Sequence, residues 1–242
     1  MKQNTAKTRI EHDLLGEEDV PAEAYYGIQT QRAAQNFDIT GVTISHYPQL
    51  IKSMAMVKHA CALSNLELGL LSEKKANAII AACVEIADGK LHDQFIVDLI
   101  QGGAGTSTNM NANEVIANRA LELLGHRKGE YQYLHPNNDV NMSQSTNDVY
   151  PTAARLAVIF SDDPLIEATT TLQTALEKKA QEFADVLKMG RTQLQDAVPM
   201  TLGQEFAGWA ITLSEDVDRM GELAALFSEV NLGGTATVSY TH

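Results

Sequence analysis

Apolar residues recur at spacings of three and four along most of this chain, which is the pattern of helices that bury one face. From Tyr47 onward the pattern predicts a series of short helices up to about Ile86, with breaks near Gly69 and Gly89. The alternation typical of strands is scarce, and the first forty residues, which glycines and a proline interrupt, are expected to be irregular. The pattern therefore predicts a mainly α fold.

Two longer helical patterns occupy the second half of the chain. The first extends from Pro164 to Leu187, and proline at the first helical position favours a helix that begins there. The second extends from Pro199 to about Val230, which corresponds to roughly 45 Å of helix. Their apolar stripes are narrow, so we expect a helical bundle that other helices or chains complete.

These patterns predict two parts. Residues 1–142 are expected to form a mostly helical N-terminal domain, and residues 143–242 the first long helices of a truncated central helical bundle. A chain of 242 residues is long enough for this organisation, because it can bury a substantial core.

Composition narrows the class of partner. The formal net charge of -13 argues against nucleic acid or an anionic membrane surface, so a small anionic ligand would need a site that is locally rich in hydrogen-bond donors. Cys61 and Cys83 lie in apolar helical stretches, where reduced thiols are favoured over a disulfide. The polar first nine residues are unlike a secretory signal, and no apolar run is long enough to span a bilayer. We therefore expect a cytoplasmic protein.

Hydroxyl and amide side chains are concentrated directly before a predicted helix in three segments: 101–109, 143–148 and 190–196. The first leads into a helix expected around 110–124. A helix start leaves backbone N–H groups unpaired and carries a partial positive charge, so such a junction binds an anion without Lys or Arg. Together, converging junctions would suit a small dicarboxylate.

A simpler interpretation stays open for each junction, because Ser, Thr and Asn before a helix usually serve only as caps. The glycines of the first segment lack the Lys-Ser/Thr ending of a phosphate loop. There is no metal-ligand spacing and no cofactor motif.

Five segments, in order along the chain, resemble the aspartase/fumarase superfamily: 9–16, 25–30, 105–115, 135–148 and 190–197. The resemblance is collinear from about residue 8 to Ala236. Residues 102–108 are similar to aspartases (aspartate ammonia-lyases), where class II fumarases tend to have Gly-Ser-Gly-Thr-Gln, and Gln193 stands where fumarases carry His. By this resemblance the chain is identified as a member of the aspartase branch.

The resemblance implies reversible elimination of ammonia from L-aspartate to give fumarate, with no cofactor and no metal. Substrate-binding roles carry over, by position, to six residues: Thr106, Ser145, Thr146, Asn147, Thr192 and Gln193. The first three would bind the β-carboxylate, where negative charge develops in the transition state. Asn147, with Thr106, would contact the amino group, and Thr192 the α-carboxylate, with Gln193 beside it.

Two further residues, His135 and Asn137, resemble an accessory anion site of fumarases, although Asn138 departs from the usual Asp there. The alternative, which is favoured at least as much, is that both lie at the surface or behind the residues that touch a ligand.

The family's general base lies in a Gly-Ser-Ser-x-Met-Pro-x-Lys-x-Asn-Pro loop, which does not occur in these 242 residues, so no catalytic residue is identified. Family members form homotetramers whose sites draw on three subunits. We therefore expect this chain to be truncated, inactive or nearly so by itself, and prone to associate through the stripe from Leu202 to Val230. The alternatives are a non-catalytic anion-binding or structural oligomer on the same scaffold, and a fumarase-type hydratase.

Overall fold

The computed structural model describes residues 7–103 and 105–234, and the chain divides into two compact units. The first unit comprises Met1–Ala157 with Val230–His242, and the second comprises Val158–Glu229. The domain boundary expected near residue 142 stays a prediction. Ala104 of the first loop lies outside the described residues, and so does the tail Thr237–His242, which the sequence predicts to be extended or disordered.

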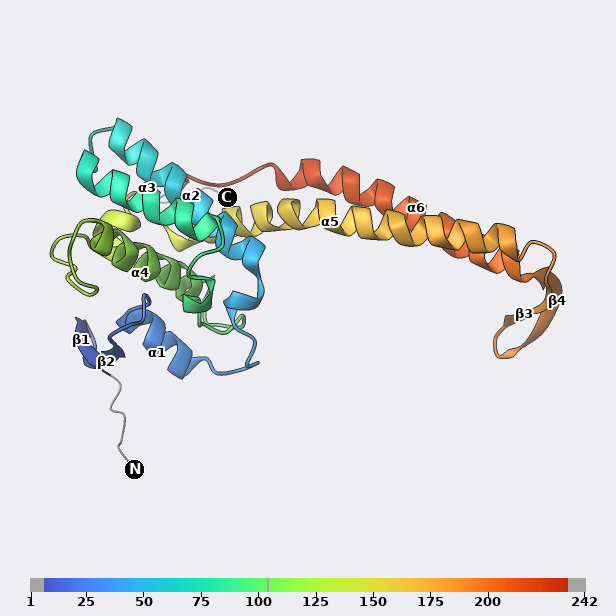
Figure 1. Cartoon of the computed structure of the whole chain (residues 1–242), viewed down its shortest axis with the longest axis horizontal. Coiled ribbons are helices and arrows are strands. Elements are labelled where there is room, and N and C mark those ends of the chain that lie inside the picture. The colour runs from blue at the N-terminus through green and yellow to red at the C-terminus, as the bar shows by residue number, and fades with distance from the viewer. Residues whose placement is uncertain (1–6, 104, 235–242) are drawn as a thin grey trace, which may run out of the picture. The chain divides into compact units, whose positions relative to one another are not determined.

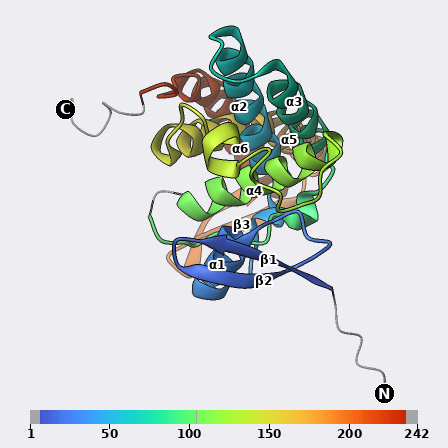
Figure 2. The same cartoon turned by 90° about the vertical axis from the view of Figure 1, so that its left-hand side faces the viewer.

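Two strands and a helix lie between Thr8 and Asn36, so the expectation of irregular structure was wrong there. Strand β1 (Thr8–Asp13) pairs antiparallel with β2 (Gly16–Pro21), and helix α1 (Ile28–Asn36) follows. Figure 2 shows the β1–β2 hairpin next to α1. The alternation was hidden because the inward-facing residue of β1 is a charged one, Glu11, rather than an apolar one.

Helices α2 (Pro48–Glu67), α3 (Glu73–Ala87) and α4 (Thr106–Leu123) form the core of the first unit. Their buried side chains are mainly aliphatic, with Ile51, Met54, Ile79, Ile86, Ile116 and Leu121 among the largest. Three short helical turns precede α2, α4 and α5, respectively: η1 (Ile44–His46), η2 (His92–Gln94) and η3 (Pro136–Val140).

The predicted breaks after the second and third helices are confirmed. Gly69 and Gly89 follow the ends of α2 and α3 with φ of +69° and +95°, a left-handed conformation that favours glycine. Gly125, with φ of +83°, follows α4 in the same way. The mainly α fold is also confirmed.

Helix α5 (Thr146–Glu182) has 37 residues and is continuous through Pro164, so the expected helix start at Pro164 was wrong (Figure 1). A proline inside a helix removes one backbone hydrogen bond, and the helical residues on both sides outweigh that local cost here.

The helix expected from Pro199 was also placed too early. Pro199 lies in β4 (Gln195–Thr201), opposite Met189 of β3 (Leu187–Thr192), and both strands of a two-stranded hairpin are edges where proline is tolerated. Helix α6 (Leu202–Phe227) begins only after Thr201, which forms a capping box with Gln204.

Within the second unit, α5 and α6 approach closely at Gly203. A Cβ atom at this position would lie 2.4 Å from the carbonyl oxygen of Ala180, so only glycine allows this approach. The rings of Phe183, Phe206 and Trp209 pack together nearby, with centroids 5.6 and 5.0 Å apart. Several large apolar side chains of this unit remain exposed: Leu165, Leu172, Trp209, Ile211, Leu223 and Leu226. Among the described residues, no helix is both long and apolar enough to cross a membrane.

Candidate functional site

The first junction is the start of α4, which begins at Thr106 and therefore four residues earlier than expected. Gly105 precedes it with φ of +92°, and a Cβ atom there would lie 2.3 Å from Cγ of Tyr150. Gln101 accepts a hydrogen bond from the backbone N–H of Thr108 at 3.0 Å and donates to its hydroxyl at 2.7 Å. Because Gln101 pairs with this helix start, the exposed Thr106 side chain is not used as a cap.

The second junction is the start of α5, where capping does occur. The Ser145 hydroxyl accepts a hydrogen bond from the backbone N–H of Asn147 at 3.2 Å, and Asp148 accepts from the N–H of Ser145 at 3.1 Å. This reciprocal pairing is similar to a capping box, with Asp in the place of Glu and with the N–H two residues after Ser145 as the capped donor. The capping interpretation thus holds for Ser145, although its hydroxyl hydrogen stays available to a ligand.

A buried network of amides joins the two junctions. Asn109 of α4 donates to the side-chain oxygen of Asn141 at 3.1 Å and to the Thr146 hydroxyl at 3.0 Å. Asn113 donates to the same Asn141 oxygen at 3.2 Å. Both asparagines of α4 are fully buried. Thr146 is therefore fixed relative to α4.

The network contains one residue that the sequence analysis missed, Lys58 of α2. It is fully buried, and its ammonium group donates to side-chain oxygens of Asn141 and Gln144, both at 2.8 Å. Burial lowers the pKa of Lys58 to about 7. The available signal was its position, because Lys58 lies on the apolar face of α2, four residues after Met54 and three before Cys61.

One cavity lies between the two junctions. It measures about 550 Å³, and residues of both loops and of the first turns of α5 line it: Gln101, Gly103, Gly105, Asn147, Tyr150 and Pro151. Its size is in the range of small-ligand sites. The structure thus brings the first two predicted loops to one cavity, which Gly105 and Asn147 line. Thr106, Ser145 and Thr146 lie at the two helix starts but are not among the residues that line the cavity. Their substrate-binding roles, and that of Asn147, stay predictions.

The third predicted loop belongs to the second unit. Thr192 ends β3, and Gln193 and Leu194 form the hairpin turn with φ of +49° and +63°. Thr192 and Gln193 are exposed there. Convergence of this loop with the other two stays a prediction.

The accessory site predicted at His135 and Asn137 contains a helical cap. Nδ1 of His135 accepts hydrogen bonds from the backbone N–H groups of Asn137 at 3.0 Å and Asn138 at 3.3 Å, which places a proton of the neutral ring on Nε2. Burial lowers the pKa of His135, against the opposing effect of Asp139. A cavity of about 610 Å³ adjoins His135, and an ion pair of 2.8 Å between Lys75 and Asp139 lies in its wall. The anion-binding role stays a prediction.

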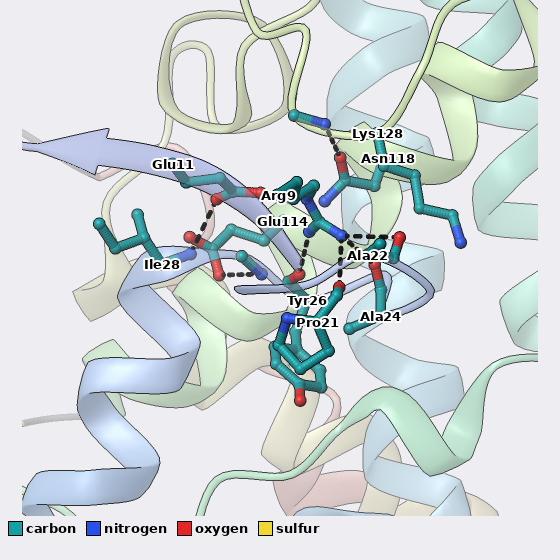
Figure 3. A network of polar contacts seen from close by, with 12 residues as sticks. Arg9, Glu11, Pro21, Ala22, Ala24, Tyr26, Ile28, Glu114, Asn118 and Lys128 are labelled. Carbon is teal, nitrogen blue, oxygen red and sulfur yellow. Dashed lines mark hydrogen bonds and ion pairs between the residues drawn. The ribbon is translucent and has the colours of Figure 1, made fainter. Parts of the chain in front are cut away.

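The N-terminal segment is held against α4 by a second polar network, drawn in Figure 3. The Arg9 guanidinium donates to four backbone oxygens between residues 21 and 26, at 2.7 to 3.2 Å, and its Nε donates to Glu11 at 2.8 Å. This contact set, the Arg9 clamp, explains how the segment that follows β2 is ordered without regular structure.

Glu114 of α4 completes this network, and sequence reasoning missed it too. Its carboxylate accepts hydrogen bonds from the N–H groups of Gly27, Gln29 and Thr30 at 2.8 to 3.0 Å, and so pairs with the start of α1. Burial, with a smaller effect of the nearby Glu11, raises the pKa of Glu114 to about 7. Among residues 7–103 and 105–234, no group of three His, Cys, Asp or Glu side chains could hold a metal ion.

Comparison with known proteins identifies relatives of this chain. A family model described as "Lyase" matches residues 16–242. The aspartate ammonia-lyase of Pseudomonas canavaninivorans is 63% identical over 234 residues, which are 96% of this chain and 49% of that protein. The aspartate ammonia-lyase of Escherichia coli (strain K12) is 58% identical over 229 residues, 94% of this chain and 48% of that protein.

Two solved structures share the fold. Fumarate lyase:delta crystallin from Brucella melitensis in native form has a TM-score of 0.89 and 60% identity, covering 94% of this chain and 53% of that one. A class II fumarase from Schistosoma mansoni has a TM-score of 0.83 and 39% identity, covering 95% and 48%. The chain spans about half the length of these relatives. With the family model matched over nearly the whole sequence and the motifs of the first two loops at one cavity, the chain belongs to the aspartase/fumarase superfamily of lyases.

Proposed function

We propose that the protein to which this sequence belongs catalyses the reversible elimination of ammonia from L-aspartate to give fumarate. The observation that carries the proposal is the pair of helix starts at one cavity, since they offer neutral donors and two positive helix ends to a small dianion. The relatives named aspartate ammonia-lyase, at 57 to 63% identity, support the choice of reaction.

In the proposed reaction a base removes a proton from C3 of aspartate, and the resulting charge is delocalised into the β-carboxylate before the amine leaves. Donors directed at that carboxylate lower the barrier most, because they bind the transition state more strongly than the substrate. We assign this role to Thr106, Ser145 and Thr146. Asn147 is assigned to the amino group, and Thr192 with Gln193 to the α-carboxylate.

The base itself is not assigned to any residue of this chain. In the resemblance it belongs to a serine loop whose motif does not occur in these 242 residues. We therefore expect the 242-residue polypeptide to show no aspartate turnover when it is the only chain present.

The proposed assembly is a homotetramer in the cytoplasm. Exposed apolar side chains along α6, such as Ile211 and Leu226, give this helix a face that a neighbouring helix could cover. Cys61 and Cys83 are free thiols, as expected in a reducing compartment.

The test measures fumarate formation from L-aspartate by ultraviolet absorbance. The polypeptide is mixed with the segment of the E. coli relative that carries the serine loop. We expect turnover only in the mixture, lost with Thr106→Val and retained with Thr174→Val. The latter makes the same change at an exposed position of α5, where the hydroxyl donates to the backbone oxygen of Thr170 in the same helix.

Other outcomes separate the alternatives. Turnover of malate without turnover of aspartate would favour a fumarase-type hydratase, the class to which the similar Schistosoma protein belongs. Turnover of neither, with dicarboxylate binding intact, would favour a non-catalytic protein on the same scaffold. Turnover of aspartate by the 242-residue chain by itself would contradict the assignment of the base.

A further inference from the structure

Lys58 is a cation in a place where cations are rare. It lies fully buried on α2, and Asn141 and Gln144 are its two neutral acceptors. Burial of an ammonium group costs free energy unless acceptors replace the lost water. Neither acceptor carries a charge, so the hydrogen bonds of Lys58 are not those of an ion pair.

The ammonium group fixes the direction of every hydrogen bond around it, because it can donate and cannot accept. Asn141 and Gln144 must therefore turn their side-chain oxygens toward Lys58. The amide NH₂ of Asn141 then points away and donates to the backbone oxygen of Gln144 at 3.2 Å. Lys58 thus determines which end of each amide faces which neighbour.

This orientation is transmitted to Thr146. Since Asn141 presents its oxygen, Asn109 must present its NH₂ group to that oxygen, at 3.1 Å. The same NH₂ group donates its second hydrogen to the Thr146 hydroxyl at 3.0 Å. With Asn109 as the donor in this pair, the hydroxyl hydrogen of Thr146 is directed elsewhere and is available to a ligand.

We propose that Lys58 is a positioning residue of the dicarboxylate site, which acts through Asn141 and Asn109 to fix the Thr146 hydroxyl as a donor to the bound carboxylate. This inference rests on the proposed function, since it takes a dicarboxylate as the ligand of Thr146. It also explains how a loop without Lys or Arg of its own is adapted to an anion.

The protonation state of Lys58 provides a specific readout. The titratable groups that act on it are Cys61 on its own helix, Cys83 on α3 and Asp148 on α5, and thiols with raised pKa values are neutral near pH 7. A neutral amine can accept a hydrogen bond, so deprotonation removes the constraint on Asn141. Affinity for succinate should therefore fall as the pH rises through about 7, the pKa of Lys58.

The decisive experiment is a double-mutant cycle on succinate affinity, measured by calorimetry with the full chain. We expect Lys58→Met and Thr146→Val each to weaken binding about tenfold, and the double variant to be no weaker than Thr146→Val, because both changes remove the same donor. Lys58→Met should also lose the pH dependence. Lys74→Met, the same change at an exposed position of α3, should bind as the wild type does.

Independent losses that multiply to roughly a hundredfold in the double variant would overturn the proposal. If Lys58→Met does not fold, Asn109→Leu replaces it in the cycle. This variant removes the same link, and its lost amide oxygen has no hydrogen-bond partner among the described residues.

Failure of the proposed function is distinguishable from failure of this inference. If the wild-type chain does not bind succinate, the dicarboxylate site is contradicted, and the network is judged by the NMR signals of the Asn109 side-chain amide. These signals should shift in Lys58→Met and stay unchanged in Lys74→Met. Unchanged signals in Lys58→Met would overturn the positioning role.

Discussion

Substituting Gly105 by alanine tests whether the junction between the first loop and α4 depends on a glycine. Its φ of +92° is unfavourable for a residue with a Cβ atom, and in addition the Cβ would lie 2.3 to 2.6 Å from three ring carbons of Tyr150. The backbone strain costs about 1–2 kcal/mol and the overpacking about 1–3 kcal/mol. We expect Gly105→Ala to reduce the free energy of unfolding by roughly 3 kcal/mol.

The two contributions can be separated with a second substitution. Tyr150→Ala removes the ring, so Gly105→Ala in that background retains only the backbone strain and should cost about 1–2 kcal/mol. The assay is urea unfolding followed by circular dichroism, with all four proteins measured under the same conditions. An equal cost of Gly105→Ala in both backgrounds would refute the claim that the Tyr150 ring occupies the space next to this glycine.

Three other predictions concern stability. Glu114→Ala leaves the N–H donors at the start of α1 without their acceptor, so it should lower the free energy of unfolding, measured with urea, by about 4 kcal/mol. A decrease below about 1 kcal/mol would contradict this role of Glu114. Gly203→Ala should lower the unfolding temperature because its Cβ would collide with a carbonyl oxygen of α5, whereas Gly208→Ala, which meets nothing within 4 Å, should not. The pKa of Lys58 is lowered to about 7 in the fold, so above that pH the unfolded chain binds more protons than the folded chain. The free energy of unfolding should therefore rise between about pH 7 and 9, and the raised pKa of Cys83, about 12, opposes this rise only above pH 9. An equally steep rise in Lys58→Met would contradict the assignment to Lys58.

The helical part of the fold could be predicted where local signals and packing agree. The apolar stripe of α2 and the glycines after α2, α3 and α4 give the same boundaries in sequence and structure. The prediction failed at Pro164 and Pro199, because proline occurs in more than one kind of regular structure. It is tolerated inside a long helix and at the edge of a two-stranded hairpin, and only the neighbouring structure determines which applies.

The candidate site, too, could be predicted from the sequence only in part. Its hydroxyl and amide loops could be recognised, because they are contiguous in sequence and precede helices. Lys58, Asn141 and Glu114 could not be assigned a role, because their partners become neighbours only after packing. Lys58 and Asn141 are 83 positions apart, Asn109 and Asn141 are 32 apart, and Gln29 and Glu114 are 85 apart. Their polar character at buried positions was the signal available in the sequence.

The Arg9 clamp has a consequence for the order of events during folding. The carbonyl groups that it binds lie 12 to 17 residues further along the chain, and the segment from Ala22 to Tyr26 has no regular structure of its own. A hairpin forms within about 1–10 μs from local contacts, so β1 and β2 can pair before this segment is held. We infer that the segment becomes ordered after the hairpin, and pulsed hydrogen exchange during refolding should protect the amides of β1 before those of residues 22–26. The N-terminal motif that identifies the family would then be one of the later parts of the chain to acquire its native conformation.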